Sequence, residues 1–250
     1  MSRPRVSVVV PFRNSKATLA ACVEGLLAQE GIGGPVEILL VDNGSTDDSV
    51  EIVRRYSEVT LLEESTPGAY AARNRALSVA QAPLIAFTDS DCVADRDWLR
   101  SIVDGFEDPR NAILVGHCRY PTEASWPLRL LAAYENAKTR YVLERCPPAY
   151  HFAYCNNMAV RAEVFDEIGP FETWKRAADS ELVHRLAARR PDLRTVFRAG
   201  QRITHHEFLR LRDRARRLRL YTQTNQQIPT FRELGWLRRL GVLGLWRRSR

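Results

Sequence analysis

Residues 83–92, Pro83-Leu84-Ile85-Ala86-Phe87-Thr88-Asp89-Ser90-Asp91-Cys92, place two carboxylates directly after a short apolar run. An apolar run of this length between polar residues is typical of a buried strand. Parallel sheets bind ligands at the carboxyl ends of their strands, where Asp89 and Asp91 would lie. Two such carboxylates repel each other unless a cation joins them, and a divalent ion that also binds substrate phosphates is the usual partner. We therefore predict a metal-dependent site for a diphosphate-containing substrate. The alternative is an acidic turn in which Asp89 caps a helix.

Apolar segments with strand and helix periodicity alternate through the first 90 or so residues. Short β-branched runs predict strands at residues 6–10, 36–41, 59–62 and 84–88, and stripes at helical spacing lie between them. This alternation predicts an α/β fold with a mostly parallel central sheet covered by helices. Later strands are expected at residues 113–116, 155–160 and 193–197, and later helices at residues 125–142 and 179–186.

Charge is distributed unevenly along the 250 residues. The net charge is +7, but residues 201–250 carry 13 Arg and only 3 acidic residues, which leaves the first 200 residues with a net charge of −3. A basic end of this kind predicts an anionic partner, such as a membrane surface, nucleic acid or a phosphorylated acceptor. The five scattered cysteines argue against a disulfide framework or a structural zinc site. No signal peptide and no membrane-spanning apolar stretch is expected, so we predict a cytoplasmic protein.

Six motifs in a fixed order carry a family resemblance. They are VSVVVPFRN at 6–14, VDNGSTDDS at 41–49, GAYAARNRAL at 68–77, IAFTDSDC at 85–92, NNMAVR at 156–161 and DSELVHRL at 179–186. With them the chain resembles the family 2 glycosyltransferases, which have the nucleotide-sugar-binding GT-A fold. The resemblance implies a catalytic domain at 1–206, with a nucleotide-binding half at about 1–116 and an acceptor half at about 117–206. Residues 207–250 then form a basic amphipathic C-terminal extension.

This resemblance also implies the reaction. An inverting enzyme of this family moves a sugar from a nucleotide-diphosphate donor, typically a UDP-sugar, to an acceptor hydroxyl by a metal-assisted single displacement. The metal is Mn²⁺ or Mg²⁺, and the acceptor is a glycan, a lipid-linked molecule or a small molecule. The leaving diphosphate gains negative charge, so it needs a metal and basic groups, while the acceptor hydroxyl needs a base. No second carboxylate nucleophile is required, unlike in retaining glycosidases.

Site residues follow from the resemblance, motif by motif. The nucleotide would be contacted by Pro11, Phe12, Arg13, Asp42, Arg73 and Asp89, with Asp42 on the base and Asp89 near the ribose and the metal. Asp91 would bind the metal, and His205, rather than His206, is expected to join it. Asp179 matches the acceptor-activating base, although Ala178 replaces the Glu that usually precedes it. Donor or acceptor sugar contacts are expected from Asn156, Asn157 and Trp174.

Each of these residues also has a purely structural interpretation. Asp42 suits a turn that caps the following helix, Arg73 a surface salt bridge, and Asp179 a helix N-cap. Asn156 and Asn157 equally suit buried backbone groups that need hydrogen-bond partners, and Trp174 suits simple packing.

The C-terminal region leaves several interpretations open. Phe208, Leu211, Ala215 and Leu218 among many arginines predict an amphipathic basic helix, which suits packing on the catalytic body. Residues 236–248 interleave Trp and Leu with Arg, which suits peripheral attachment to the anionic inner face of a membrane, with a dimer contact as the alternative. A nucleic-acid-binding protein would use this end too, but it leaves the acidic motifs unexplained, so nucleic acid is not the expected partner. A catalytically inactive GT-A scaffold is a further alternative because of Ala178.

Overall fold

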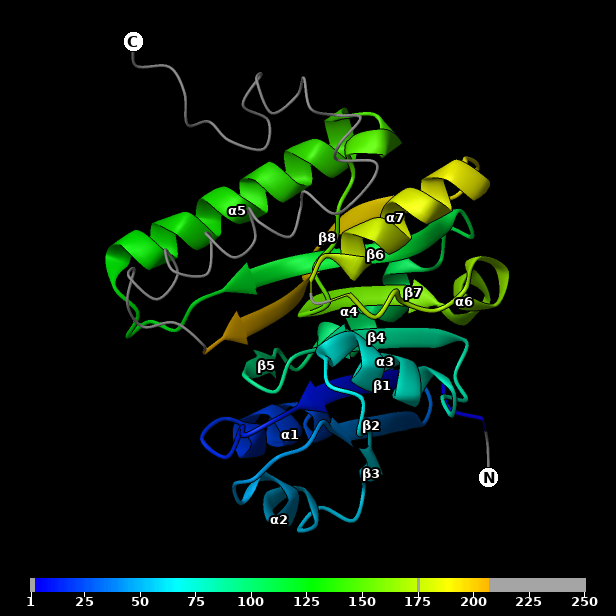
Figure 1. Ribbon diagram of the computed structural model, residues 1–250. Coiled ribbons are helices and arrows are strands. Elements are labelled where there is room, and N and C mark those ends of the chain that lie inside the picture. Colours follow the sequence, from blue (N-terminus) through cyan, green and yellow to red (C-terminus); the bar gives the residue numbers. More distant parts are fainter. Residues whose placement is uncertain (1–2, 175, 207–250) are drawn as a thin grey trace.

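The computed structural model describes residues 3–174 and 176–206. Their core is an eight-stranded sheet in the order β3-β2-β1-β4-β7-β6-β8-β5 (Figure 1). The strands are β1 (Val6–Phe12), β2 (Val36–Asp42), β3 (Thr60–Glu63), β4 (Leu84–Thr88), β5 (Cys92–Ala94), β6 (Asn111–Arg119), β7 (Asn157–Arg161) and β8 (Arg194–His205).

Strand direction confirms the predicted α/β sheet and adds two reversals. Strands β3, β2, β1 and β4 are mutually parallel, and β6 is parallel to β8. Strand β7 runs antiparallel to both β4 and β6, and β5 runs antiparallel to β8. The sheet is continuous across residue 116, so β6 spans the expected boundary between the two halves of the catalytic domain.

Helices cover both faces of the sheet because its strands are apolar on both sides. All seven residues of β1 are buried, with Val9 facing one core cluster and Val8 and Val10 facing the other. Fully burying such side chains contributes about 1.5–3 kcal/mol each. The Val9 face is covered by α3 (Ala69–Leu77), α6 (Ala162–Ile168) and α7 (Ala178–Arg189), and the opposite face by α1 (Leu19–Leu27), α2 (Ser49–Val53) and α4 (Trp98–Gly105). A 20-residue helix, α5 (Trp126–Arg145), and the short η1 (Pro148–Tyr150) complete the described elements.

The structure corrects two sequence-based expectations. Strand β5 was not expected, and β8 has 12 residues instead of the expected five. Strand β8 is long because it passes a bulge: Gly116 pairs with Arg198, but the next residue of β6 pairs with Arg202. The charged residues in this part of β8 conceal its strand character from a search for apolar periodicity.

Gly116 is required at this bulge by its close neighbours. A Cβ atom there would lie 2.3 Å from Asn157 Nδ2 and 2.4 Å from the Gln201 carbonyl oxygen. Only glycine therefore fits between β7 and β8 at this point.

In residues 3–174 and 176–206, none of the helices has both the length and the apolar character needed to cross a bilayer. The expected basic helical extension at 207–250 lies outside the described residues.

Candidate active site

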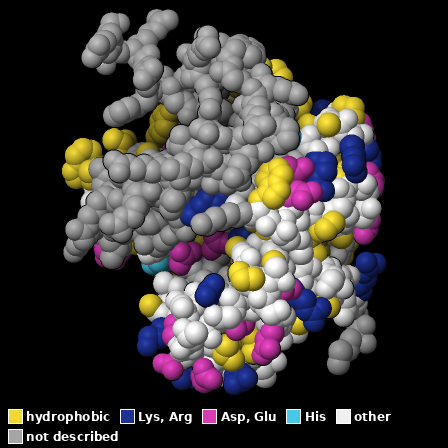
Figure 2. Space-filling model, in the orientation of Figure 1, with side chains coloured by type: hydrophobic (Ala, Val, Ile, Leu, Met, Phe, Trp, Pro, Cys, Tyr) yellow, Lys and Arg dark blue, Asp and Glu magenta, His cyan; other side chains and the backbone are white. Residues whose placement is uncertain are grey.

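Four expected site residues lie at or just beyond the carboxyl ends of strands. Asp42 ends β2, Asp89 and Asp91 follow β4, and His205 ends β8. The turn after β1 is tied to the acidic turn by a hydrogen bond of 2.8 Å between the Ser15 and Ser90 hydroxyl groups. Figure 2 shows acidic and histidine side chains close together in this part of the molecule. The sheet thus brings Asp91 and His205, which are 114 positions apart in the sequence, to within 3.2 Å of each other.

Asp89 and Asp91 point to different cationic partners, which relieves the repulsion between two nearby carboxylates. Asp89 Oδ1 accepts a hydrogen bond of 2.5 Å from Arg73 Nη2. The Arg73 side chain is only 5% exposed, whereas that of Asp89 is 36% exposed. The alternative that Arg73 forms a surface salt bridge is therefore wrong, because the guanidinium lies in the interior, over the Tyr70 ring at 5.3 Å.

Asp91 pairs with His205, and not with His206. His205 Nε2 lies 3.2 Å from Asp91 Oδ1, while the exposed His206 binds the Asp91 carbonyl oxygen through its backbone amide at 2.7 Å. Burial would raise the pKa of Asp91, but the hydrogen bond and charge of His205 hold it below its ordinary value. Burial would lower the pKa of His205, but Asp91 and Cys118 raise it to about 10.

A third potential ligand atom lies beside this pair. The Asp91, Cys92 and His205 ligand atoms all lie within 4.8 Å of one another. Burial, together with the charges of Asp91 and Asp89, raises the pKa of the Cys92 thiol well above its ordinary value. Cys92 therefore stays protonated at neutral pH, and the Asp91 carboxylate remains as the ready ligand for a hard cation. The imidazole of His205 can join it only by giving up its proton, because a metal ligand has to be deprotonated.

Asp179 lies in the first turn of α7, close enough to the Arg73–Asp89 ion pair for the charge of Arg73 to act on its carboxylate. Its two oxygens accept hydrogen bonds from the backbone amides of Ser180, at 2.8 Å, and Cys155, at 3.1 Å. The N-cap alternative is wrong, since the cap is Ala177, in the left-handed conformation with φ 67°. Burial raises the pKa of Asp179 above its ordinary value, although both amides and the charge of Arg73 oppose this. A carboxylate with a raised pKa is a stronger base than an exposed one.

The remaining expected nucleotide contacts lie at the ends of β1 and β2. Pro11 and Phe12 are buried, and Phe12 packs in the core, while Arg13 is exposed at the edge. The half-buried Asp42 accepts hydrogen bonds from the Ser45 amide at 3.0 and 3.3 Å. This is the turn-capping arrangement named above as the structural interpretation of Asp42.

Asn157 lies in the interior, where its hydrogen bonds join four elements. Its Oδ1 accepts bonds from Trp98 Nε1 at 2.8 Å and Gln201 Nε2 at 2.9 Å. Its Nδ2 donates to the carbonyl oxygens of His117 and Gln201. Only 2% of the surface of Asn157 is exposed, so its side chain serves as a hydrogen-bond partner for buried groups and is not exposed for the expected sugar contact. Asn156 and Trp174, by contrast, are both half-buried.

Two residues that position the site were not recognised in the sequence. Tyr70 lies one turn before Arg73 on α3, beneath the guanidinium, so the i, i+3 spacing was the available signal. Asn43 fixes the start of α3: its Oδ1 accepts the Gly68 amide at 2.7 Å, and its Nδ2 donates to the Glu64 and Thr66 carbonyl oxygens. No helix or strand pattern identifies such a loop-bridging asparagine.

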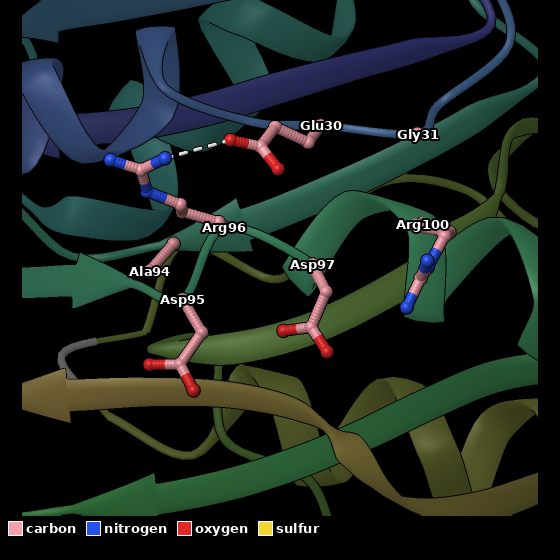
Figure 3. Close-up of a pocket in the computed structure, with 7 residues that line it drawn as sticks. All are labelled: Glu30, Gly31, Ala94, Asp95, Arg96, Asp97 and Arg100. Atoms are coloured by element: carbon pink, nitrogen blue, oxygen red, sulfur yellow. Dashed lines mark hydrogen bonds and ion pairs between the residues drawn. The ribbon is translucent and has the colours of Figure 1, made fainter.

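A cavity of about 630 Å³ lies beside β5 and the start of α4 (Figure 3). Its lining consists of Glu30, Gly31, Ala94, Asp95, Arg96, Asp97 and Arg100, none of which is an expected site residue. Arg96 pairs with Glu30 at 2.9 Å, and Arg202 on β8 pairs with Asp95 at 2.9 Å and with Asp97 at 3.0 Å. The pairs of Arg202 fasten the residues next to β5 and α4 to β8, and the Arg96–Glu30 pair joins the segment after β5 to the segment after α1, so the acidic residues here have a structural role.

Comparison with known sequences gives one family. The sequence profile of Glycosyl transferase family 2 matches residues 7–169. Glycosyltransferase AglE of Haloferax volcanii is 29% identical over 174 residues, which cover 67% of this chain and 56% of that protein. The uncharacterized glycosyltransferase YibD of Escherichia coli is 38% identical over 94 residues, covering 36% of this chain and 27% of that protein. The chain thus spans about half of the length of AglE and about a quarter of the length of YibD.

Solved structures show the same fold. The mannosyltransferase PcManGT from Pyrobaculum calidifontis, in complex with GDP-Man and Mn²⁺, superposes with a TM-score of 0.66 at 24% identity, over 84% of this chain and 59% of that chain. Residues 1–349 of S. aureus TarS, in complex with UDP-GlcNAc, give a TM-score of 0.64 at 18% identity, over 82% of this chain and 59% of that chain. The expected GT-A fold is confirmed.

Proposed function

This chain belongs to glycosyl transferase family 2, and from that premise we propose that it moves a sugar from a nucleotide-diphosphate donor to an acceptor hydroxyl with inversion. The observation that carries the proposal is the pair of divergent carboxylates after β4, with Asp89 held by Arg73 and Asp91 beside His205. Such a carboxyl edge of parallel strands is where α/β sheets bind nucleotides.

The donor is proposed to be a UDP-sugar. Asp42 ends β2 at the nucleotide edge, where its carboxylate would accept a hydrogen bond from the N–H of uracil. Pro11 and Arg13 at the end of β1 would flank the same nucleotide, and Arg73 would hold Asp89 toward the ribose. Two solved structures of the same fold contain the donors GDP-Man and UDP-GlcNAc, which supports this class of donor without deciding the base.

The residues present fit a divalent metal ion. Asp91 would hold it, and His205 would join once the ion's charge displaces the proton from its ring, since the carboxylate and the ring nitrogen converge there. Mg²⁺ prefers oxygen ligands, so the nitrogen of His205 favours Mn²⁺. When bound, the ion would stabilise the negative charge of the leaving diphosphate. The Mn²⁺ in PcManGT supports this choice.

Asp179 is proposed as the base for the acceptor hydroxyl. The Ser180 and Cys155 amides orient its carboxylate, and burial raises its pKa. In this chain Arg73 and Tyr70 lie near Asp179, so they take over the positioning that a preceding Glu would provide where Ala178 stands. Proton transfer by such a base contributes about 10²–10⁴-fold to the rate.

The experiment that tests the donor and the metal together is a thermal-shift screen of UDP-, GDP- and dTDP-sugars with and without Mn²⁺. A ligand present at 100 times its Kd stabilises by about 2.7 kcal/mol, which for a chain of this size raises Tm by roughly 5–10 °C. We expect this shift for a UDP-sugar with Mn²⁺, and its loss in Asp91→Asn. The exposed Asp104→Asn, on α4, is the matched control. A full shift in Asp91→Asn would contradict the metal site.

Residues 236–248 are proposed to attach the protein peripherally to the inner face of an anionic membrane, because Trp and Leu alternate with Arg there. Co-sedimentation with vesicles that contain phosphatidylglycerol should weaken when Arg238, Arg239 and Trp246 are all changed to Gln. Equal binding of this variant and the unchanged protein would rule the segment out as the attachment site.

A further inference from the structure

The outer face of α5 presents large apolar side chains to solvent. Trp126, Leu130 and Tyr141 are 69%, 62% and 62% exposed, and Tyr134 is 43% exposed. Their spacing of four, four and seven residues puts them on one side of the helix, which is about 30 Å long. The opposite side is buried against the body through Leu128, Ala132, Thr139, Val142 and Leu143. We call the exposed stripe Trp126, Leu130, Ala133, Tyr134, Ala137 and Tyr141 the outer face of α5.

Basic residues flank the outer face on both sides. At about 100° per residue, Arg129 and Arg140 lie along one border, and Lys138 and Arg145 along the other. Arg140 pairs with Glu144 at 3.0 Å, and Lys138 pairs with Glu135. Within residues 3–174 and 176–206, neither Arg129 nor Arg145 has an acidic partner. Glu144 lies at the C-terminal end of the outer face itself, where Arg140 neutralises it. Arg129 and Arg145 therefore leave a net positive charge on the borders, beside a mostly apolar centre.

We propose that the outer face of α5 docks on an anionic lipid surface. Trp and Tyr rings prefer the level of lipid headgroups, because each has an apolar body and a polar edge. Leu130 would enter the acyl boundary, and the flanking arginines would meet anionic headgroups. This arrangement of an apolar stripe between two basic borders is typical of a helix that lies in a membrane interface.

Charge argues against the two other occupants. A second copy docked through the same face would bring the cationic borders together, with like charges opposed. The segment 207–250 is itself strongly basic, so its packing on α5 meets the same repulsion. Only a negatively charged partner complements both the borders and the apolar centre.

Docking through α5 would hold the candidate site near the lipid. Asn136 on α5 binds both backbone groups of Cys118, accepting at 3.0 Å and donating at 2.6 Å. Cys118 pairs with Ile203 on β8, two residues before His205. Tyr120, just before α5, stacks on the His205 ring at 6.1 Å. In Figure 1, α5 lies at the opposite end of the molecule from α2. This surface is distinct from residues 236–248, and it goes beyond the proposed transfer activity without depending on it.

The test uses the full chain and vesicles of phosphatidylcholine with or without phosphatidylglycerol. Changing Trp126, Leu130 and Tyr141 to Gln should lower the partition coefficient on anionic vesicles by roughly tenfold or more, because their buried apolar area is lost. Leu27→Gln/Val79→Gln, which removes exposed apolar side chains elsewhere, is the matched control and should bind as the unchanged protein does. Arg129→Gln/Arg145→Gln should weaken binding to anionic vesicles and leave binding to neutral ones unchanged.

Two further measurements keep the proposal falsifiable. Melting temperatures show whether the exposed-site variants fold, and quenching of tryptophan fluorescence by brominated lipid, compared with Trp126→Phe, reports whether Trp126 enters the bilayer. Residues 236–248 are the same in every variant, so they contribute equally. Equal vesicle binding by the triple variant and the control would overturn the proposal. The proposal would also be overturned if the triple variant kept its vesicle binding but lost self-association or oligonucleotide binding, because the outer face of α5 would then bind a second copy or a nucleic acid.

Discussion

Replacing Arg73 with methionine tests whether a buried cation organises the candidate site. Removing one member of a fully buried ion pair costs about 3–5 kcal/mol, whereas an exposed pair contributes about 0–1 kcal/mol. Arg73 is buried, but Asp89 is 36% exposed and recovers water once the pair is broken. We therefore expect a loss of about 1–3 kcal/mol from the pair, with about 0.5–1 kcal/mol more from the lost contact with the Tyr70 ring.

The two losses add up to about 1.5–4 kcal/mol, and for a chain of this size each kcal/mol lowers Tm by about 2–4 °C, so Arg73→Met should melt roughly 3–16 °C below the unchanged protein. Arg75→Met, an exposed arginine on the same helix, is the matched control and should leave Tm almost unchanged. A double-mutant cycle with Asp89→Ala isolates the pair, and its coupling energy should be about 1–3 kcal/mol.

The same variant has a functional readout. The charge of Arg73 lowers the pKa of Asp179, so its removal should raise that pKa further. The acidic limb of the pH profile of kcat/KM, measured with a donor found by the thermal-shift screen, should therefore move to higher pH. An unchanged Tm, a coupling energy near zero and an unmoved acidic limb would together refute the role given to Arg73.

Three further predictions concern Asp179 and Asn157. Asp179→Asn should keep donor binding and lose about 10²–10⁴-fold in transfer rate, and transfer near the original rate would place the base elsewhere. In the unchanged protein the acidic limb of the pH profile of kcat/KM should lie above the ordinary Asp pKa of about 3.9, because the pKa of Asp179 is raised. For the same reason the free energy of unfolding, measured by urea titration, should fall as pH rises through the raised pKa of folded Asp179. Asp179→Asn should reduce this fall. Asn157→Leu should lower the free energy of unfolding by about 3 kcal/mol or more, because it leaves Trp98 Nε1 and the Gln201 amide without their partner, and a cost below about 1 kcal/mol would contradict this.

The edge of the sheet that is proposed to bind the nucleotide was predictable because its strands are largely buried on both faces. Strands β1, β2 and β4 are mostly apolar, interrupted only by Ser7 and Glu37 near the starts of β1 and β2, and each is followed by or ends in a polar residue. Both the strands and the acids at the ends of β2 and β4 can therefore be predicted from the local sequence. Strand β5 and the second half of β8 were not readable. Asp95, which directly follows β5, and Arg202 look like loop residues in sequence, but in the fold they are joined at the sheet edge by an ion pair of 2.9 Å and a backbone hydrogen bond of 3.0 Å.

Which side chains contact each other within the site depends on how segments that are distant in the sequence align in the fold. His205 was favoured over His206 from its place after an apolar-polar run, and the side chain of His205 is the one that contacts Asp91. Asn157 had two equal interpretations, because an amide suits a sugar as well as a backbone group. Its partners Trp98 and Gln201 lie 59 and 44 residues away, so only the folded arrangement decides between them.

The crowded glycine of β6 has a consequence for how this sequence can evolve. Gly116 leaves no space for a side chain against Asn157 and Gln201, while Asn157 also satisfies the buried Trp98 ring. In related proteins glycine should therefore persist at 116, because a smaller residue at 157 would not relieve the contact with the Gln201 backbone carbonyl. Loss of the amide at 157 should accompany loss of the indole at 98. Substitution of any one of them alone would be selected against, because all four are buried and packed against one another.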